Sequence, residues 1–202
     1  MKTKYIISVI LIGIVALFAI SNQAKATDKT KSQKEITKND LTKSDIEGIK
    51  YMREEEKLAH DVYTFYAEQY NIPIFRNISR SETQHQKAVM WLMGKYGVKD
   101  ISKPNAGEFS NTRLQKMYND LTQGTTLIDG LKAGALIEEQ DITDLKERLA
   151  KTDNADIQRV YGNLIRGSEN HLRAFVRNLS RRGIDYQPKV LNRSTFSDIV
   201  QQ

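Results

Sequence analysis

Residues 56 to 67 read Glu56-Lys57-Leu58-Ala59-His60-Asp61-Val62-Tyr63-Thr64-Phe65-Tyr66-Ala67. Ala59, Tyr63 and Tyr66 follow one another at steps of three and four residues, which is the spacing of one face of an α-helix. Glu56 lies on the same face, where an apolar side chain is expected. The stretch therefore predicts an amphipathic helix with a carboxylate on its buried face.

The same kind of interruption occurs in three further segments. Apolar residues at helical spacing predict four long helices, over residues 44–70, 77–96, 126–151 and 154–182. Each predicted buried face carries polar ionisable side chains near its middle, and no Lys or Arg lies on these faces at the same level. The interrupting residues are Glu56, Glu82, His85, Glu138 and His171.

Several helix ends have recognisable signals. Ser44 with Glu47, and Ser79 with Glu82, have the spacing of a capping box. Asn71-Ile72-Pro73 ends the first helix, Gly97 ends the second, and Asn154 belongs to the turn before the fourth. A connection of about thirty residues separates the second and third helices and contains a short predicted helix over residues 111–121. The polar segment after Asp185 carries no predicted structure.

No alternation of strands and helices occurs, so the predicted fold class is all-α. Two short connections and one long connection are typical of a four-helix bundle with a crossover between its second and third helices. The chain has 202 residues, 39% of them hydrophobic, and no cysteine. This composition suits one globular domain and excludes a disulfide scaffold, a zinc ribbon and thiol-dependent catalysis.

Residues 1–26 have the features of a secretory signal peptide: early lysines, an apolar core of about fifteen residues and an Ala-x-Ala end at Ala26. An uncleaved anchor is the alternative. Cleavage leaves no stable membrane anchor and predicts a periplasmic or extracellular protein. Residues 27–43 then form a flexible linker, 44–190 the helical domain, and 191–202 a C-terminal tail.

The net charge of +6 includes three lysines of the predicted signal peptide, and without them 28 basic residues face 25 acidic ones. This small excess gives no reason to expect a nucleic-acid partner. The sequence also lacks a glycine-rich phosphate loop.

Buried carboxylates without cationic partners are costly, by several kcal/mol each on a rough estimate. A bound divalent metal supplies the missing positive charge. Glu82-Thr-Gln-His85 places a carboxylate and an imidazole on one helix face, as in di-iron carboxylate bundles. Glu138 and Ser168 are expected at the same height on neighbouring helices. Polar contacts among the acids themselves are the structural alternative.

The stretch from Glu56 to Ala67, with Glu82-x-x-His85, resembles the first two metal-binding helices of rubrerythrin-type ferritin-like proteins. Residues 44–190 are similar to a domain-of-unknown-function family of bacterial and archaeal ferritin-like proteins. The resemblance implies a ferritin-like four-helix fold with a dinuclear metal centre. Iron is the first choice for the two ions that the resemblance implies, and manganese or a mixed pair are the alternatives.

The resemblance also implies the ligands, which are Glu56, Glu82, His85, Glu138, Asp141 and His171. Ser168 departs from the pattern because rubrerythrins have a bridging Glu there. Glu169 is rotated from that position by about 100° and is a poor substitute. Asp141 restores the count of four carboxylates and two imidazoles, while a weak or empty second position stays open.

Other polar residues near the first motif have simpler interpretations. Glu54 and Glu55 are expected to face solvent, and Tyr63 to lie in the core. His60 lies near the edge of the buried face. Its role is open between a metal ligand, a neighbour of a ligand and neither. Asp61 orients a ligand or caps a nearby group.

Two classes of function fit the sequence. The first is an exported di-iron protein that oxidises Fe(II) or reduces O2 or peroxide, with electrons from a separate donor or from Fe(II) itself. The second is a non-catalytic helical bundle for envelope binding or metal sequestration with a degenerate metal site. The oligomeric state is open, with a homodimer among the alternatives.

Overall fold

The structure is a computed structural model and describes residues 41–201. These residues form helices and no strand, which confirms the all-α prediction for this part of the chain. The predicted signal peptide and residues 27–40 of the predicted linker lie outside the described residues. None of the described helices combines the length and the apolar character needed to cross a membrane. The helices are α2 (Lys43–Gln69), α3 (Pro73–Tyr96), α4 (Thr112–Leu121), α5 (Leu127–Leu149), α6 (Ala155–Ser180) and α7 (Arg193–Val200).

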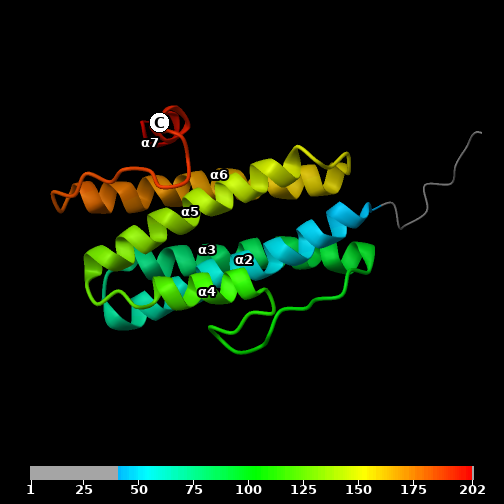
Figure 1. Cartoon of the computed structure of the whole chain (residues 1–202), viewed down its shortest axis with the longest axis horizontal. Coiled ribbons are helices and arrows are strands. Elements are labelled where there is room, and N and C mark those ends of the chain that lie inside the picture. The colour runs from blue at the N-terminus through cyan, green and yellow to red at the C-terminus, as the bar shows by residue number, and fades with distance from the viewer. Residues whose placement is uncertain (1–40, 202) are drawn as a thin grey trace, which may run out of the picture. The chain divides into compact units, whose positions relative to one another are not determined.

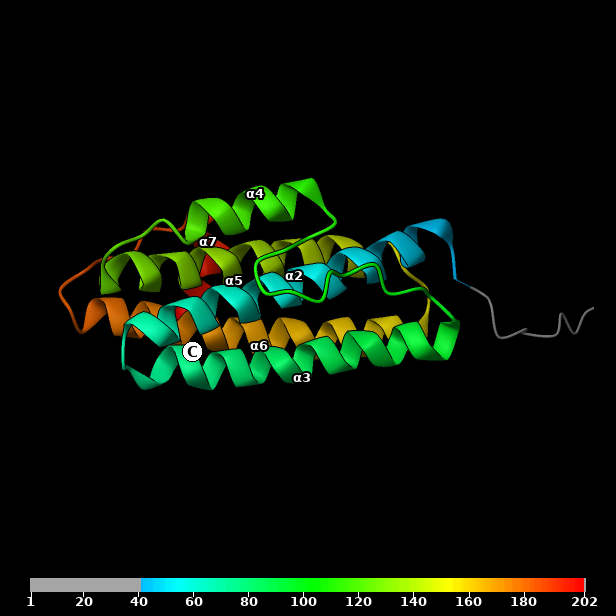
Figure 2. The same cartoon turned by 90° about the horizontal axis from the view of Figure 1, so that it is seen from below.

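The four long helices contact one another in pairs (Figures 1 and 2). α2 packs against α3 and α5, and α6 packs against α5 and α3. On α2, Tyr51 contacts Asp144 and Tyr63 contacts Glu138, so α2 and α5 run in opposite directions. The connection from α3 to α5 contains α4, which lies against α2.

The start of α2 differs from the predicted cap. Thr42, not Ser44, is the N-cap residue, and its hydroxyl accepts a hydrogen bond from the Asp45 backbone N–H at 3.1 Å. The Asp45 carboxylate in turn accepts from the Thr42 backbone N–H at 2.9 Å. This reciprocal pair has the same three-residue spacing as Ser44 and Glu47, and it lets the helix begin one residue earlier.

The start of α3 was predicted four residues too late. α3 begins at Pro73, whose ring fixes φ near the helical value and whose missing N–H would have no partner in the first turn. Ser79 and Glu82 are therefore interior residues and form no capping box. The earlier start sets Glu82 and His85 a full turn deeper in the helix, which brings His85 level with Glu56 on α2.

A buried polar layer separates two apolar clusters. One cluster contains Val62, Tyr63 and Phe175, and the other contains Met52, Leu92 and Leu164. On α2, α3 and α6, the Glu, His and Ser residues at the predicted site lie between the residues of these clusters. Apolar packing therefore closes the layer at both ends and keeps bulk water away from it.

The connection after α3 is held to α2 by acidic side chains. Glu54 accepts hydrogen bonds from the backbone N–H groups of Ser110 at 2.6 Å and Asn111 at 2.9 Å. Asp61 accepts from the Gly107 N–H at 2.9 Å and pairs with Lys57. The prediction that Glu54 faces solvent is wrong, because the connection covers it. Asp61 anchors this connection.

The C-terminal segment is also structured, contrary to the sequence prediction, and contains α7. The Glu139 side chain on α5 is fully buried and accepts hydrogen bonds from the Tyr186 hydroxyl at 2.7 Å. The same carboxylate accepts from the backbone N–H groups of Lys189, Val190 and Leu191 at 3.0, 2.9 and 2.8 Å. One carboxylate thus fastens the segment that leads to α7.

Candidate metal centre

The six predicted ligands lie together in the polar layer between α2, α3, α5 and α6. Five of them are buried, with exposed fractions of 1–2% for the three glutamates and 8% for His171. His85 is half-buried, with 12% of its side chain exposed. Glu82 is at the middle of the group. Its Oε2 lies 2.8 Å from Nδ1 of His85, and its Oε1 lies 2.8 Å from Nδ1 of His171.

Each imidazole also faces a second glutamate. Nδ1 of His85 lies 3.1 Å from Oε2 of Glu56, and Nδ1 of His171 lies 3.5 Å from Oε1 of Glu138. The two rings are stacked, with centroids 5.3 Å apart. Side chains from all four long helices therefore meet at one Glu82 carboxylate.

Glu82, His85 and His171 form a group that could hold a metal ion, since one ligand atom from each lies within 4.8 Å of the others. Oε1 of Glu82 and Nδ1 of His171 are 2.8 Å apart as an ion pair, but neither atom makes a hydrogen bond of good geometry. Two atoms bound at about 2.1 Å to one ion, at right angles, are about 3 Å apart. The spacing and the missing hydrogen bond both fit ligands that point at a common centre.

Asp141 lies on the same layer but has a different partner. Its Oδ2 accepts a hydrogen bond of 2.5 Å from the Ser168 hydroxyl, and its Oδ1 has no partner. Glu169, the neighbour of Ser168, lies outside the layer and pairs with Lys146 at the surface. Ser168 is therefore the residue of α6 that engages one oxygen of Asp141.

Two contacts that orient the candidate ligands have no signal in the sequence. Nε2 of His171 lies 3.0 Å from the Ser81 hydroxyl, which fixes the ring with Nδ1 toward Glu82. The Tyr63 hydroxyl donates to Oε1 of Glu138 at 2.6 Å. Tyr63 is in the core as expected, but its hydroxyl belongs to the centre. His60 is outside the centre: its side chain is 32% exposed and contacts Asp61.

Gly167 on α6 makes room for His85. A Cβ atom at this position would lie 2.5 Å from Nε2 of His85. We expect Gly167→Ala to displace the ring and to weaken metal binding by about 10- to 100-fold, the range for groups that orient a ligand. Gly162→Ala on the same helix is the matched control, because its Cβ meets nothing within 4 Å. Equal metal affinity in the two variants, measured by competition with a chelator, would contradict this role of Gly167.

Burial and mutual contacts shift the pKa values across the layer. Burial disfavours the imidazolium form, but Glu82 and Glu56 raise the pKa of His85 to about 12, and Glu138 and Glu82 raise the pKa of His171 to about 10. Burial raises the pKa of Glu56 to about 7, against the lowering effect of His85. Burial also acts to raise the pKa of Glu82, but the two imidazoles outweigh it and lower that pKa.

These pKa values predict that metal binding releases protons. Without metal, both imidazoles are protonated at pH 7, and an ion that binds Nδ1 must displace a proton from each. Metal affinity should therefore increase with pH, by up to tenfold per pH unit for each displaced proton, until the pH passes the pKa of His171 at about 10. The number of protons released should fall by up to about one between pH 6 and pH 8, because Glu56 ionises near pH 7. Calorimetry with Zn²⁺ in buffers of different ionisation enthalpy counts these protons, and a pH-independent affinity would refute the prediction.

Glu55 is buried beside the centre, although the sequence predicts that it faces solvent. The Tyr51 hydroxyl donates to Glu55 at 3.3 Å and to Asp144 at 3.0 Å. Burial and the nearby carboxylates of Asp141 and Asp144 raise the pKa of Glu55 well above its usual value. No signal in the sequence separates Glu55 from an exposed acid, since the covering groups come from α5.

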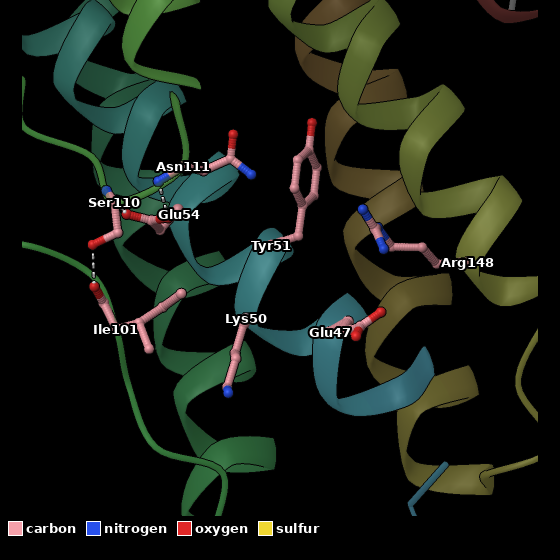
Figure 3. Close-up of a pocket in the computed structure, with 8 residues that line it drawn as sticks. All are labelled: Glu47, Lys50, Tyr51, Glu54, Ile101, Ser110, Asn111 and Arg148. Carbon is pink, nitrogen blue, oxygen red and sulfur yellow. Dashed lines mark hydrogen bonds between the residues drawn. The ribbon is translucent and has the colours of Figure 1, made fainter. Parts of the chain in front are cut away.

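An open pocket of about 490 Å³ lies on the outer side of Tyr51 (Figure 3). Tyr51 of α2 and Arg148 of α5 face one another at one side of it, and Glu54 with Ser110 and Asn111 forms the other. Tyr51 therefore lines this pocket and also contacts the buried acids Glu55 and Asp144 through its hydroxyl.

Comparison with known proteins gives relatives over almost all of the described region. A family model described as "Uncharacterized protein domain (DUF2202)" matches residues 45–202. The uncharacterized protein MJ0754 of Methanocaldococcus jannaschii is 40% identical over 168 residues, which are 82% of this chain and 91% of the relative. A crystal structure of hypothetical protein MJ0754 superposes with a TM-score of 0.78 at 41% identity and covers 80% of this chain and 94% of that chain.

Proposed function

We propose that this chain, which belongs to the DUF2202 family of uncharacterized protein domains, is a ferritin-like metalloprotein that holds two metal ions, iron foremost. The observation that carries the proposal is the convergence of both Glu82 oxygens on Nδ1 of His85 and of His171. In the described part of the chain, no Lys or Arg forms an ion pair with these carboxylates. Without metal, the imidazolium groups of His85 and His171 compensate part of the charge of Glu56, Glu82 and Glu138. A bound cation would replace the displaced protons and compensate the remaining charge.

The donor set fits such a pair of ions. Glu82 would serve both ions, with Glu56 and His85 as further ligands for one and Glu138 and His171 for the other. Oε1 of Glu56, Oε1 of Glu82, Nδ1 of His171 and Oδ1 of Asp141 are buried without hydrogen-bond partners, so donor atoms are free for coordination. Imidazole and carboxylate ligands suit iron or manganese.

The fold proposed for this function is a ferritin-like four-helix bundle of α2, α3, α5 and α6 with a crossover through α4. The observed pair contacts between these helices support it. When bound as Fe(II), the metal pair would supply electrons for the reduction of O2 or peroxide. The protein itself orients the ligands through Ser81 and Tyr63 and excludes water through the two apolar clusters.

Ser168 favours a second candidate function, which is metal sequestration or envelope binding by a bundle with an incomplete site. Its hydroxyl occupies Oδ2 of Asp141, so the position beside His171 has one carboxylate fewer than a second Glu-x-x-His motif would give. In this case one ion is held well, the other position is weak, and no steady consumption of peroxide occurs.

Metal content separates these functions. The protein is purified anaerobically, loaded with Fe(II), and analysed for metal per chain. About two irons, with steady-state consumption of O2 or peroxide, would support the dinuclear enzyme. About one iron would support the incomplete site, and no bound iron, manganese or zinc would refute both metal-binding proposals.

Export and partners complete the proposal. Removal of residues 1–26 would place the protein in the periplasm or outside the cell, without a stable membrane anchor. The chain has no cysteine and so cannot form a rubredoxin-like iron module, so its electrons would come from a separate donor or from Fe(II). Mass determination of the exported protein tests the cleavage, and light scattering tests for a homodimer.

A further inference from the structure

A second polar cavity lies away from the metal centre, near the start of α2. It has a volume of about 50 Å³, more than the space that one water molecule needs. Gly48 lies eight residues before Glu56, or about 12 Å along the helix. The lining residues are Ser44, Asp45, Gly48, Arg148, Lys151 and Tyr161.

Two buried donors of this cavity have no partner. Tyr161 is only 1% exposed, and its hydroxyl makes no hydrogen bond. Nε of Arg148 is likewise buried and unpaired. Among residues 41–201, no carboxylate pairs with the Arg148 guanidinium, which lies 4.3 Å over the ring of Tyr51 (Figure 3). Buried donors left without acceptors cost about 1–3 kcal/mol each, so a ligand that accepts hydrogen bonds would stabilise the site.

Gly48 creates the space that these donors face. A Cβ atom on Gly48 would lie 3.3 Å from the Tyr161 hydroxyl oxygen and 3.6 Å from Nη1 of Arg148. The Tyr161 hydroxyl and the Arg148 guanidinium therefore both lie beside the point where any other residue of α2 would place its side chain. The cavity depends on a glycine at this position.

The charges around the cavity favour an anion. Arg148 and Lys151 contribute two positive charges, and the first turn of α2 adds the positive end of a helix dipole. Asp45 is the one acid in the lining, and its Oδ2 already accepts from the backbone N–H and the hydroxyl of Thr42 at 2.9 and 2.7 Å. Burial raises the pKa of Tyr161, so its hydroxyl stays protonated as a donor.

We propose that this cavity binds a small oxyanion, such as inorganic phosphate or a carboxylate group, between Arg148, Lys151 and Tyr161. The oxyanion accepts from the guanidinium and from the Tyr161 hydroxyl and joins the start of α2 to α5 and α6. The site is separate from the metal centre and does not depend on the proposed redox function.

Calorimetric titration with sodium phosphate, and separately with sodium acetate, at constant ionic strength tests the proposal. Tighter binding of phosphate identifies a phosphoryl group as the natural ligand class, and tighter binding of acetate identifies a carboxylate. We expect one site per chain, weakened about tenfold or more in Arg148→Gln because a hydrogen-bonded charge is lost. Gly48→Ala should abolish binding by filling the cavity, while Gly94→Ala, whose Cβ meets nothing within 4 Å, should preserve it.

Two control variants and one null outcome test whether the binding is specific to this cavity. Arg166→Gln removes the same charge from an exposed position of α6, and equal weakening there would reduce the effect to general electrostatics and overturn the proposal. Loss of phosphate binding in Glu82→Gln would place the anion at the metal centre instead. Should the protein show no heat with either anion, and no shift of the Arg148 Nε–H signal in ¹⁵N spectra, the cavity holds water only and the proposal fails.

Discussion

Replacement of Glu82 by Gln is expected to remove most of the metal from the protein. Among residues 41–201, Glu82 is the side chain that forms ion pairs with both His85 and His171, at 2.8 Å each. The substitution keeps the shape of the side chain but removes the negative charge and one of its two acceptor oxygens. Since the proposed positions share this carboxylate, both should be affected, and metal content should fall from near two ions per chain to well below one.

Glu169→Gln is the matched control for this experiment. Glu169 lies on α6 two residues before His171, but its side chain is partly exposed and pairs with Lys146 at 3.2 Å. Elemental analysis after identical Fe(II) loading should show full metal content in this variant. Circular dichroism of both variants establishes that the helices are intact. Full metal content in folded Glu82→Gln would refute the proposed centre.

Replacement of Glu139 by Ala is expected to release the C-terminal segment and to lower stability by about 3 kcal/mol. The loss follows because the Tyr186 hydroxyl and three consecutive backbone N–H groups share this one buried carboxylate. For a domain of this size, the melting temperature should fall by about 6–12 °C. α7 should detach from α6 before the four long helices unfold.

Amide hydrogen exchange measures this release directly. In Glu139→Ala, the amides of Lys189, Val190 and Leu191 should lose most of their protection, while amides in the middle of α2 should keep theirs until global unfolding. Glu147→Ala is the control, because Glu147 lies on the same helix and is exposed. Unchanged protection at residues 189–191 would show that Glu139 does not hold the segment.

The helices could be predicted from the sequence because apolar spacing and capping residues are local signals. Apolar spacing located α2, α5 and α6 to within about two residues, and Asn111 and Asn154 cap the helices expected to start beside them. The errors have local causes too. At the start of α2, two residue pairs have the spacing of a capping box, and the sequence does not distinguish them. Pro73 is compatible both with the end of one helix and with the first residue of the next.

The buried acids divide into two groups. Glu56, Glu82 and Glu138 interrupt apolar faces at helical spacing, so the sequence predicts their burial. Glu54, Glu55 and Glu139 lie off those faces and are buried by segments distant in the chain. The connection that precedes α4 covers Glu54, helix α5 covers Glu55, and the C-terminal segment covers Glu139.

The amino-acid sequence is sufficient to predict long amphipathic helices with carboxylates and imidazoles inside their apolar faces. Helical periodicity depends only on neighbours a few residues apart. Three features follow only from the packing of the helices: Glu82 contacts both His85 and His171, Ser168 engages Asp141, and Gly48 leaves a cavity beside Arg148. These contacts depend on how far each helix extends and on which side chains of other helices reach the same point, and no local pattern contains that information.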